Sequence, residues 1–275
     1  MSVINTNVNA LFAQNSMKTN ARAMGSAMEK LSTGSRINNA KDDAAGLAIG
    51  ATMTSQIRGL NQAVRNANDG INMMQTAEGA MVEQSNMLQR MRELAVQASN
   101  GTYSSTQRSY LQNEFDQLGS QITDISTDTT WNSINLLDGT GSAGFSFQVG
   151  QNSGQTISIE VASMSFSALA ANVTLGSAVS SAAAAQTTIA ELDSALETIN
   201  QQRSTIGAGI NRLTYAADNL TNIASNVTAS RSTVMDTDYA EASTQLSKTQ
   251  IIQQAATAML AQANQQPQSV LSLLK

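Results

Sequence analysis

The sequence MTSQIRGLNQAVRNANDGINMM, residues 53–74, places apolar side chains at alternating spacings of four and three residues. This spacing is typical of a coiled-coil seam, in which apolar residues lie along one face of an α-helix. The seam changes phase near Gly70 and Gly79 and then continues to residue 98. A continuous helix over residues 53–98 would be roughly 70 Å long at 1.5 Å per residue. Asn100-Gly101 is expected to end it.

A second seam of similar length runs through residues 189–227, and a shorter one runs from Leu111 to Ile125. Antiparallel pairing of the two long seams would bury both apolar faces. Interior proline breaks helices, and the chain contains one proline in 275 residues. The predicted fold class is therefore mainly α, a long antiparallel coiled-coil-like helical rod.

Residues 145–161 depart from this helical spacing. Phe145, Phe147 and Val149 alternate with polar residues, and alternation resumes from Ile157 to Val161 after a glycine-containing turn. Alternation of this kind predicts a β-hairpin with a longer loop. Residues 162–185, which are mostly small, predict no particular element.

The two ends of the chain carry weaker apolar stripes than the middle. In residues 1–34 and 240–275 the stripe is diluted by Ala, Asn, Gln and Lys. Burying a Leu or Ile contributes about 1.5–3 kcal/mol, and burying an Ala contributes far less. We therefore expect both ends to be disordered in the monomer and to fold when they pack against each other and against other copies.

Capping residues predict where the terminal helices begin and end. Gly34 is expected to end the first helix, and Asp42 or Asp43 to cap the next one. Asp236 or Asp238 is expected to cap the last helix, and Pro267 to end it. The predicted domains are residues 1–44 with 232–275, formed by the terminal helices, and residues 45–231, formed by the long helices and the hairpin.

Composition excludes several classes of function. The chain contains no histidine and no cysteine, so it has no imidazole base, thiol nucleophile or disulfide, and no metal site that depends on those ligands. We expect no catalytic, cofactor-binding or metal-binding residues. The net charge of −5 argues against nucleic-acid binding.

No apolar run approaches the ~20 residues of a membrane helix. Because residues 1–7 show no signal-peptide pattern, we expect a cytosolic protein or one exported without a cleaved signal.

Two motifs that suggest ligand binding have simpler explanations. The run from Gly139 to Gly144 matches G-x-G-x-x-G, but it precedes a predicted strand instead of opening a helix, so we interpret it as a flexible turn. Asp236, Asp238 and Glu241 lack the twelve-residue loop of a calcium site, and helix capping explains them better.

Several consecutive motifs resemble bacterial flagellin, the subunit of the flagellar filament. They are INTNVNAL (4–11), LSTGSRIN (31–38), KDDAAGLA (41–48), LQRMRELAVQA (88–98), FQVGQNSGQTI (147–157), IGAGINRL (206–213), AATAMLAQAN (255–264) and PQSVLSLL (267–274). The resemblance implies that the terminal helices form the inner tube of a hollow filament and that the long helices form the next shell. Flagellins usually insert variable outer domains where this chain has only residues 162–185, so it resembles a minimal form without them.

The same resemblance implies the partners and the location. The chain is expected to polymerise with copies of itself into the filament used for motility. It is expected to be secreted uncleaved by the flagellar type III export apparatus, with an export chaperone on its C-terminal segment. Hook-associated junction and cap proteins are the further implied partners, and the extracellular flagellum is the implied location.

One segment of the first long seam is the candidate contact site. Gln89, Arg90, Glu93 and Gln97 lie opposite the seam by helical spacing, which by itself is typical of a solvated polar face. The resemblance implies a subunit contact that the flagellin-sensing vertebrate Toll-like receptor also recognises. The implied contact residues are Leu88, Gln89, Arg90, Glu93, Leu94, Val96, Gln97 and Glu114, of which Arg90, Leu94 and Glu114 match the main recognition positions.

Two alternatives to a filament subunit remain at this level. A hook–filament junction protein would share both terminal regions but would cap the filament instead of extending it. A coiled-coil regulator or receptor signalling fragment would be helical as a free dimer, would have no hairpin and would form no filament. An enzyme is the class that the composition favours least.

Overall fold

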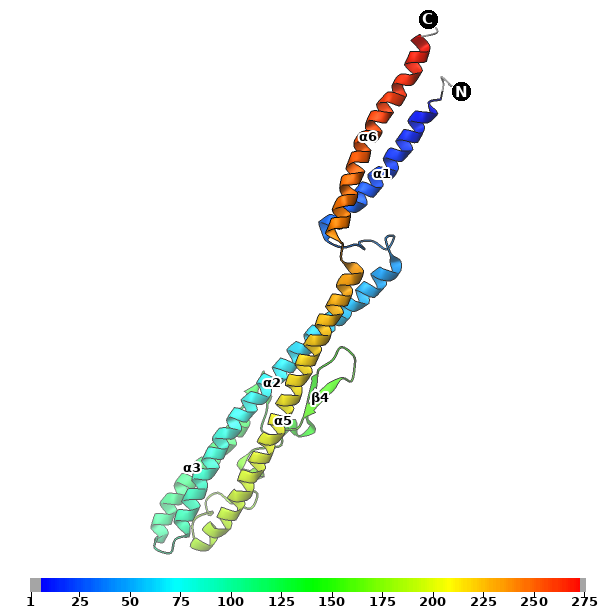
Figure 1. Cartoon of the computed structure of the whole chain (residues 1–275). Helices are drawn as coiled ribbons and strands as arrows, with labels where there is room; N and C mark the ends of the chain where they lie inside the picture. The colour runs from blue at the N-terminus through cyan, green and yellow to red at the C-terminus, as the bar shows by residue number, and fades with distance from the viewer. Residues whose placement is uncertain (1–5, 273–275) are drawn as a thin grey trace. The chain divides into compact units, whose positions relative to one another are not determined.

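The computed structural model describes residues 6–272, with side chains through Gln265. The chain forms two compact units. One contains the described residues up to Ile57 together with those from Ser225 onward, and the other is Arg58–Ala224. Both unit boundaries fall within long helices (Figure 1). The predicted domain boundaries at residues 44 and 232 stay a prediction.

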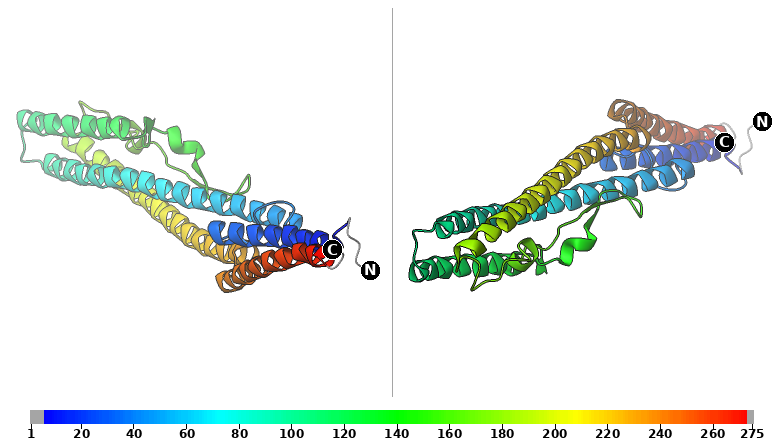
Figure 2. Two further views of the ribbon diagram at one scale, coloured as in Figure 1. Left: turned by 90° about the horizontal axis from the view of Figure 1, so that it is seen from above. Right: turned by 90° about the horizontal axis from the view of Figure 1, so that it is seen from below.

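The unit Arg58–Ala224, which we call the central unit because it holds the middle of the sequence, is built on antiparallel helices. This arrangement confirms the predicted fold class. It contains most of α2 (Ala44–Ser99) and α5 (Ala182–Met235), and all of α3 (Ser105–Asp128). In Figures 1 and 2, α3 and α5 run alongside α2. Seam residues from all three helices share one buried cluster: Met74, Met81, Leu88, Met91, Phe115, Ile122, Leu192, Ile199, Ile206 and Leu213. The two predicted long seams therefore do bury each other.

Two ion pairs between α2 and α5 confirm the antiparallel direction. Arg92 of α2 binds Asp193 near the start of α5, with Nε 2.5 Å from Oδ1. The guanidinium of Arg203, further along α5, lies 2.7 Å from a carboxylate oxygen of Glu78, which comes earlier in α2. Moving back along α2 therefore corresponds to moving forward along α5.

The predicted hairpin is present as β3 (Phe145–Gln148) and β4 (Thr156–Ile159), paired antiparallel with Phe147 opposite Ile157. It packs on glycines of the two long helices. A Cβ on Gly70 of α2 would lie 2.8 Å from the Phe147 ring, and one on Gly209 of α5 would lie 2.5 Å from Ile159. These positions require glycine because any larger residue would occupy the space of a hairpin side chain.

The chain between α3 and α5 contains elements that the sequence pattern did not reveal. A short hairpin pairs β1 (Thr130–Trp131) with β2 (Ile134–Asn135), and a 3₁₀ turn η1 (Thr140–Ala143) precedes β3. A single helical turn, α4 (Phe166–Leu169), brings Phe166 edge-on to Phe115 of α3, with ring centroids 6.3 Å apart. The helix α5 begins at Ala182, seven residues before the predicted seam.

In the other unit, α1 (Val8–Thr33) and α6 (Tyr239–Ser272) lie side by side (Figures 1 and 2). The predicted boundaries hold at three points. Gly34 ends α1 in the left-handed conformation, with φ of 72°. The Asp43 carboxylate accepts a hydrogen bond from the Gly46 N–H at the start of α2, and the Asp238 carboxylate accepts one from the Ala240 N–H at the start of α6.

The connections that follow α1 and precede α6 are joined by an antiparallel bridge between Ser35 and Asp236. The Arg36 N–H donates to the Met235 carbonyl at 2.7 Å, and the Thr237 N–H donates to the Gly34 carbonyl at 2.9 Å. The two connections are therefore joined by backbone hydrogen bonds, which do not depend on the identity of the side chains.

The prediction that Pro267 ends the last helix is wrong, because α6 continues to Ser272. Proline has no N–H and leaves the carbonyl four residues earlier without its helical partner. That carbonyl belongs to Ala263, and its oxygen accepts a hydrogen bond from the side chain of Asn7 at 2.8 Å. The predicted stripe of the first helix begins at Ile4, which lies outside the described residues.

Candidate assembly interface

The α1–α6 pair buries little apolar surface. Its buried side chains within the described residues are Ala10, Asn20 and Ala27 on α1, and Ala242 and Thr249 on α6. Larger apolar side chains of the same two helices are exposed to solvent, and we call them the terminal apolar surface: Val8, Leu11, Phe12, Met28, Ile251, Ile252 and Met259. Phe12 is 70% exposed and Met259 is 66% exposed. Large apolar side chains left exposed on a helix pair make it a candidate interaction surface.

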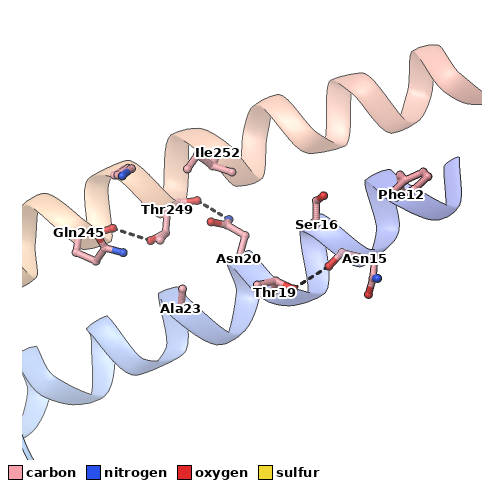
Figure 3. Close-up of a pocket in the computed structure, with 10 residues that line it drawn as sticks. Phe12, Asn15, Ser16, Thr19, Asn20, Ala23, Gln245, Thr249 and Ile252 are labelled. Carbon is pink, nitrogen blue, oxygen red and sulfur yellow. Dashed lines mark hydrogen bonds between the residues drawn. The ribbon is translucent and has the colours of Figure 1, made fainter. Parts of the chain in front are cut away.

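An open groove of about 500 Å³ runs between the two helices (Figure 3). Phe12 and Ile252 contribute apolar side chains to it, and Asn20 and Thr249 lie at the contact between the helices. The Asn20 amide donates to the Thr249 carbonyl at 2.7 Å, and the Thr249 hydroxyl donates to the Gln245 carbonyl at 3.0 Å. The groove therefore has a mixed lining, with Phe12, Ala23 and Ile252 among mainly polar side chains, and its Asn20 and Thr249 are already hydrogen-bonded.

The second candidate surface is the predicted contact segment of α2. The structure places Gln89, Arg90, Glu93, Val96, Gln97 and Glu114 at the exposed surface, and it buries Leu88 and Leu94. Leu94 is 1% exposed and belongs to the main core cluster. It therefore supports the segment by packing from behind, and the polar residues and Val96 form the accessible face.

Arg90 joins the predicted residues of two helices. Its guanidinium lies 3.0 Å from a Glu93 carboxylate oxygen on α2 and 2.9 Å from one of Glu114 on α3. Hydrogen bonds to Glu93 and Glu114 raise the pKa of Arg90 above its ordinary value. Exposed ion pairs contribute only about 0–1 kcal/mol each, so this cluster orients the side chains more than it stabilises the fold.

Further charged contacts involve residues outside the predicted set of contact residues. Hydrogen bonding to Asp193 raises the pKa of Arg92, and hydrogen bonds from Thr140 lower the pKa of Asp138. No periodicity could have identified these partners, because each contact joins a surface position to a distant segment or a turn. Across residues 6–272, no group of three metal-ligating side chains is found, and no helix is apolar and long enough to cross a bilayer.

Comparison with known proteins identifies the family. The chain matches the family model of the bacterial flagellin N-terminal helical region over residues 4–142 and that of the C-terminal helical region over residues 189–274. A flagellin of Halalkalibacterium halodurans is 44% identical over 273 residues, which cover 99% of this chain and 100% of that protein. The flagellar filament 33 kDa core protein of Treponema phagedenis is 40% identical, with the same coverage of both chains.

Among solved structures, the crystal structure of Bacillus cereus flagellin matches with a TM-score of 0.51 and 33% identity, over 61% of this chain and 94% of that one. The 275 residues of the chain fit the predicted minimal form. The chain belongs to the bacterial flagellin family, a family of structural filament proteins and not of enzymes.

Proposed function

We propose that the chain polymerises into the flagellar filament by burying its terminal apolar surface between copies. The observation that carries this proposal is the exposure of large apolar side chains on a helix pair that buries mainly alanines. Each Leu, Ile, Phe or Met buried at a contact contributes about 1.5–3 kcal/mol. In the proposal these contacts join unlike surfaces without closing into a ring, and contacts that do not close generate an open helical polymer.

Folding of the termini is coupled to this assembly in the proposal. Residues 1–44 with 232–275 form the inner tube, and residues 45–231 form the shell around it. The scarcity of buried apolar residues between α1 and α6 supports this coupling, because the isolated pair has little burial to offset the entropy of ordering about sixty residues. The monomer is therefore expected to gain its terminal helices at the growing end.

Filament growth from purified protein tests the proposal. Monomer precipitated with ammonium sulfate should form filaments of unlimited length by electron microscopy, whereas a junction protein would give short or capped assemblies. Phe12→Ser should raise the concentration needed for growth by about tenfold or more, because each 1.4 kcal/mol changes the equilibrium constant tenfold. Only short oligomers from the parent chain, or unchanged growth of Phe12→Ser, would contradict the proposal.

We further propose that the chain is secreted by the type III export apparatus without cleavage, with an export chaperone on its C-terminal segment, and that it acts in an extracellular flagellum beside hook-associated junction and cap proteins. Family membership supports this part of the proposal. The alternative of a coiled-coil regulator is disfavoured by the β3–β4 hairpin, since such a fragment would have no hairpin.

Receptor recognition is proposed for the α2 face that carries Arg90, Glu93 and Val96 with Glu114 of α3. Soluble monomer should activate cells that express the flagellin-sensing Toll-like receptor, and Arg90→Ala should reduce the response at least severalfold, since it removes the cation shared by two carboxylates. Arg92→Ala is the matched control, because this arginine faces Asp193 of α5 instead. No response to monomer, or equal responses of the two variants, would contradict the assignment.

Leu94→Ala requires a stability measurement beside the reporter assay. Removing a fully buried leucine side chain costs about 2–5 kcal/mol. A reduced response of Leu94→Ala supports the proposed receptor contact only if its circular dichroism spectrum matches that of the parent chain, because an unfolded variant would also lose the response.

A further inference from the structure

We propose that Asn7 and Asn20 of α1 set the register of α1 along α6 by donating hydrogen bonds to backbone carbonyls of α6. The inference rests on the proposed function in one respect: termini that fold during assembly must find their alignment in each new subunit. Positioning of this kind differs from stabilisation, because it selects one alignment among several of similar apolar content.

Apolar packing by itself discriminates poorly between alignments of the two helices. The apolar side chains buried on the described part of the pair are Ala10, Ala27 and Ala242. The α6 sequence AATAMLAQA, residues 255–263, offers alanine at many neighbouring positions. A slip of one turn would exchange alanine contacts for other alanine contacts and would shift the half-buried Leu246 and Leu260. Since neither leucine is fully enclosed, the cost stays below that of misplacing a fully buried Leu or Ile.

The carbonyl of Ala263 differs from the other carbonyls inside α6. Pro267 is the one proline of the chain and lies inside α6, so Ala263 lacks the helical N–H donor four residues ahead of it. The Asn7 side-chain N–H donates to this oxygen at 2.8 Å. The Asn7 side-chain oxygen meanwhile accepts the Ala10 N–H at 3.0 Å and so caps α1. The beginning of α1 is thereby bound to the one interior carbonyl of α6 that proline leaves unpaired.

Asn20 provides the second fixed point. It is 8% exposed, and its amide nitrogen lies 2.7 Å from the Thr249 carbonyl and 3.2 Å from the side-chain oxygen of Gln253. The hydroxyl of Thr249 turns back to carbonyls of its own helix, so the small threonine leaves its backbone oxygen open to Asn20. A buried amide left without partners would cost about 1–3 kcal/mol, which penalises any alignment that separates these groups.

The hydrogen bonds of Asn7 and of Asn20 correspond to the same alignment of the two helices. Asn7 and Asn20 are thirteen residues apart, and their acceptors at Ala263 and Thr249 are fourteen residues apart in the opposite direction. The difference corresponds to about 1.5 Å along a helix, which side-chain rotation absorbs. Ala27 and Ala242 continue the same alignment, since both are buried and both line one groove further along the pair. Both amide bonds therefore form together in a single antiparallel register.

Disulfide trapping in the full-length chain tests the register directly, since the chain has no cysteine of its own. The pair Ala27→Cys with Ala242→Cys reports the observed alignment, and Ala27→Cys with Leu246→Cys reports a slip of one turn. Slow oxidation followed by non-reducing electrophoresis separates bonds within a chain from bonds between chains. In the parent, the yield of the first pair should exceed that of the second by about tenfold or more.

Substitutions that remove the two donors should lower the ratio of the disulfide yield of the first cysteine pair to that of the second. Asn7→Asp keeps the capping oxygen of α1 but has no N–H to donate, and Asn20→Leu adds apolar contact while removing the buried amide. The double variant should retain or increase helix content by circular dichroism, yet its ratio should fall by about tenfold. Gln14→Glu, the same change of charge on an exposed residue of α1, should leave the ratio unchanged.

The outcomes separate this inference from the proposed function. An unchanged ratio in the double variant would overturn the register assignment, even where filaments form normally. A ratio that falls also in Gln14→Glu would overturn it as well, because added charge alone would then account for the change. The ratio is read in assembled filaments, where the proposed function expects the termini to be folded. Absence of filaments from the parent would contradict the proposed function, and the ratio is then read in monomer whose termini resist proteolysis.

Discussion

A chain trimmed to residues 45–231 is expected to remain folded and to form no filaments. The main buried cluster, which includes Leu88, Phe115 and Ile199, lies entirely within this segment. The terminal apolar surface, by contrast, is removed completely. Because the trimmed chain keeps its core and loses the surface proposed to drive assembly, its polymerisation should fall below detection in ammonium sulfate while its helix content per residue remains high.

Brief proteolysis of the intact monomer supplies the complementary measurement. Disordered termini should be cut first and should leave a resistant core near residues 45–230, because cleavage requires locally unfolded chain. The same protease should leave residues 1–34 and 240–265 intact in assembled filaments. Filaments grown from the trimmed chain, or termini that resist cleavage in dilute monomer, would refute coupled folding and assembly.

Gly209→Ala is expected to destabilise the central unit by about 1–3 kcal/mol, through overpacking against the hairpin. A Cβ at this position would lie 2.5 Å and 2.9 Å from two side-chain carbons of Ile159, which is 3% exposed and has little room to move. The gain in helix propensity offsets only about 0.5–1 kcal/mol of this cost. Chemical denaturation followed by circular dichroism measures the difference.

Gly207→Ala is the matched control, two residues away on the same helix. A Cβ there meets nothing within 4 Å, so the substitution should stabilise the chain by about 0.5–1 kcal/mol. Opposite signs for two identical substitutions in α5 would show that Gly209 is required by packing. Equal and positive changes in stability at both positions would contradict the packing of Ile159 on Gly209.

Much of the fold could be predicted because it follows local rules. Seam spacing predicted α2, α3 and α5, alternation predicted the hairpin, and capping chemistry predicted the ends at Gly34, Asp43 and Asp238. The β1–β2 hairpin was not predicted, because strands of two residues are too short to show alternation. Pro267 was interpreted by its local effect alone, although a donor from α1 binds the carbonyl that it leaves unpaired.

Part of the candidate contact site could be predicted, because helical spacing is also a local rule. Helical spacing placed Gln89, Arg90, Glu93 and Gln97 on the face opposite the seam, and the structure exposes all four. Spacing could not show that Arg90 binds Glu114 of another helix, since the ion pair depends on how α2 and α3 pack. It also left Leu94 at the edge of the seam, whereas packing against the other helices buries that side chain.

By itself, the sequence determined which faces of the chain are apolar, where the helices begin and where most of them end, because spacing and capping act over a few residues. Only the tertiary structure decided which glycines receive the hairpin, which carboxylates bind Arg90, and which carbonyls of α6 receive the amides of α1. The physical reason is that these contacts join residues distant in sequence. Their distances are fixed only after the helices have packed.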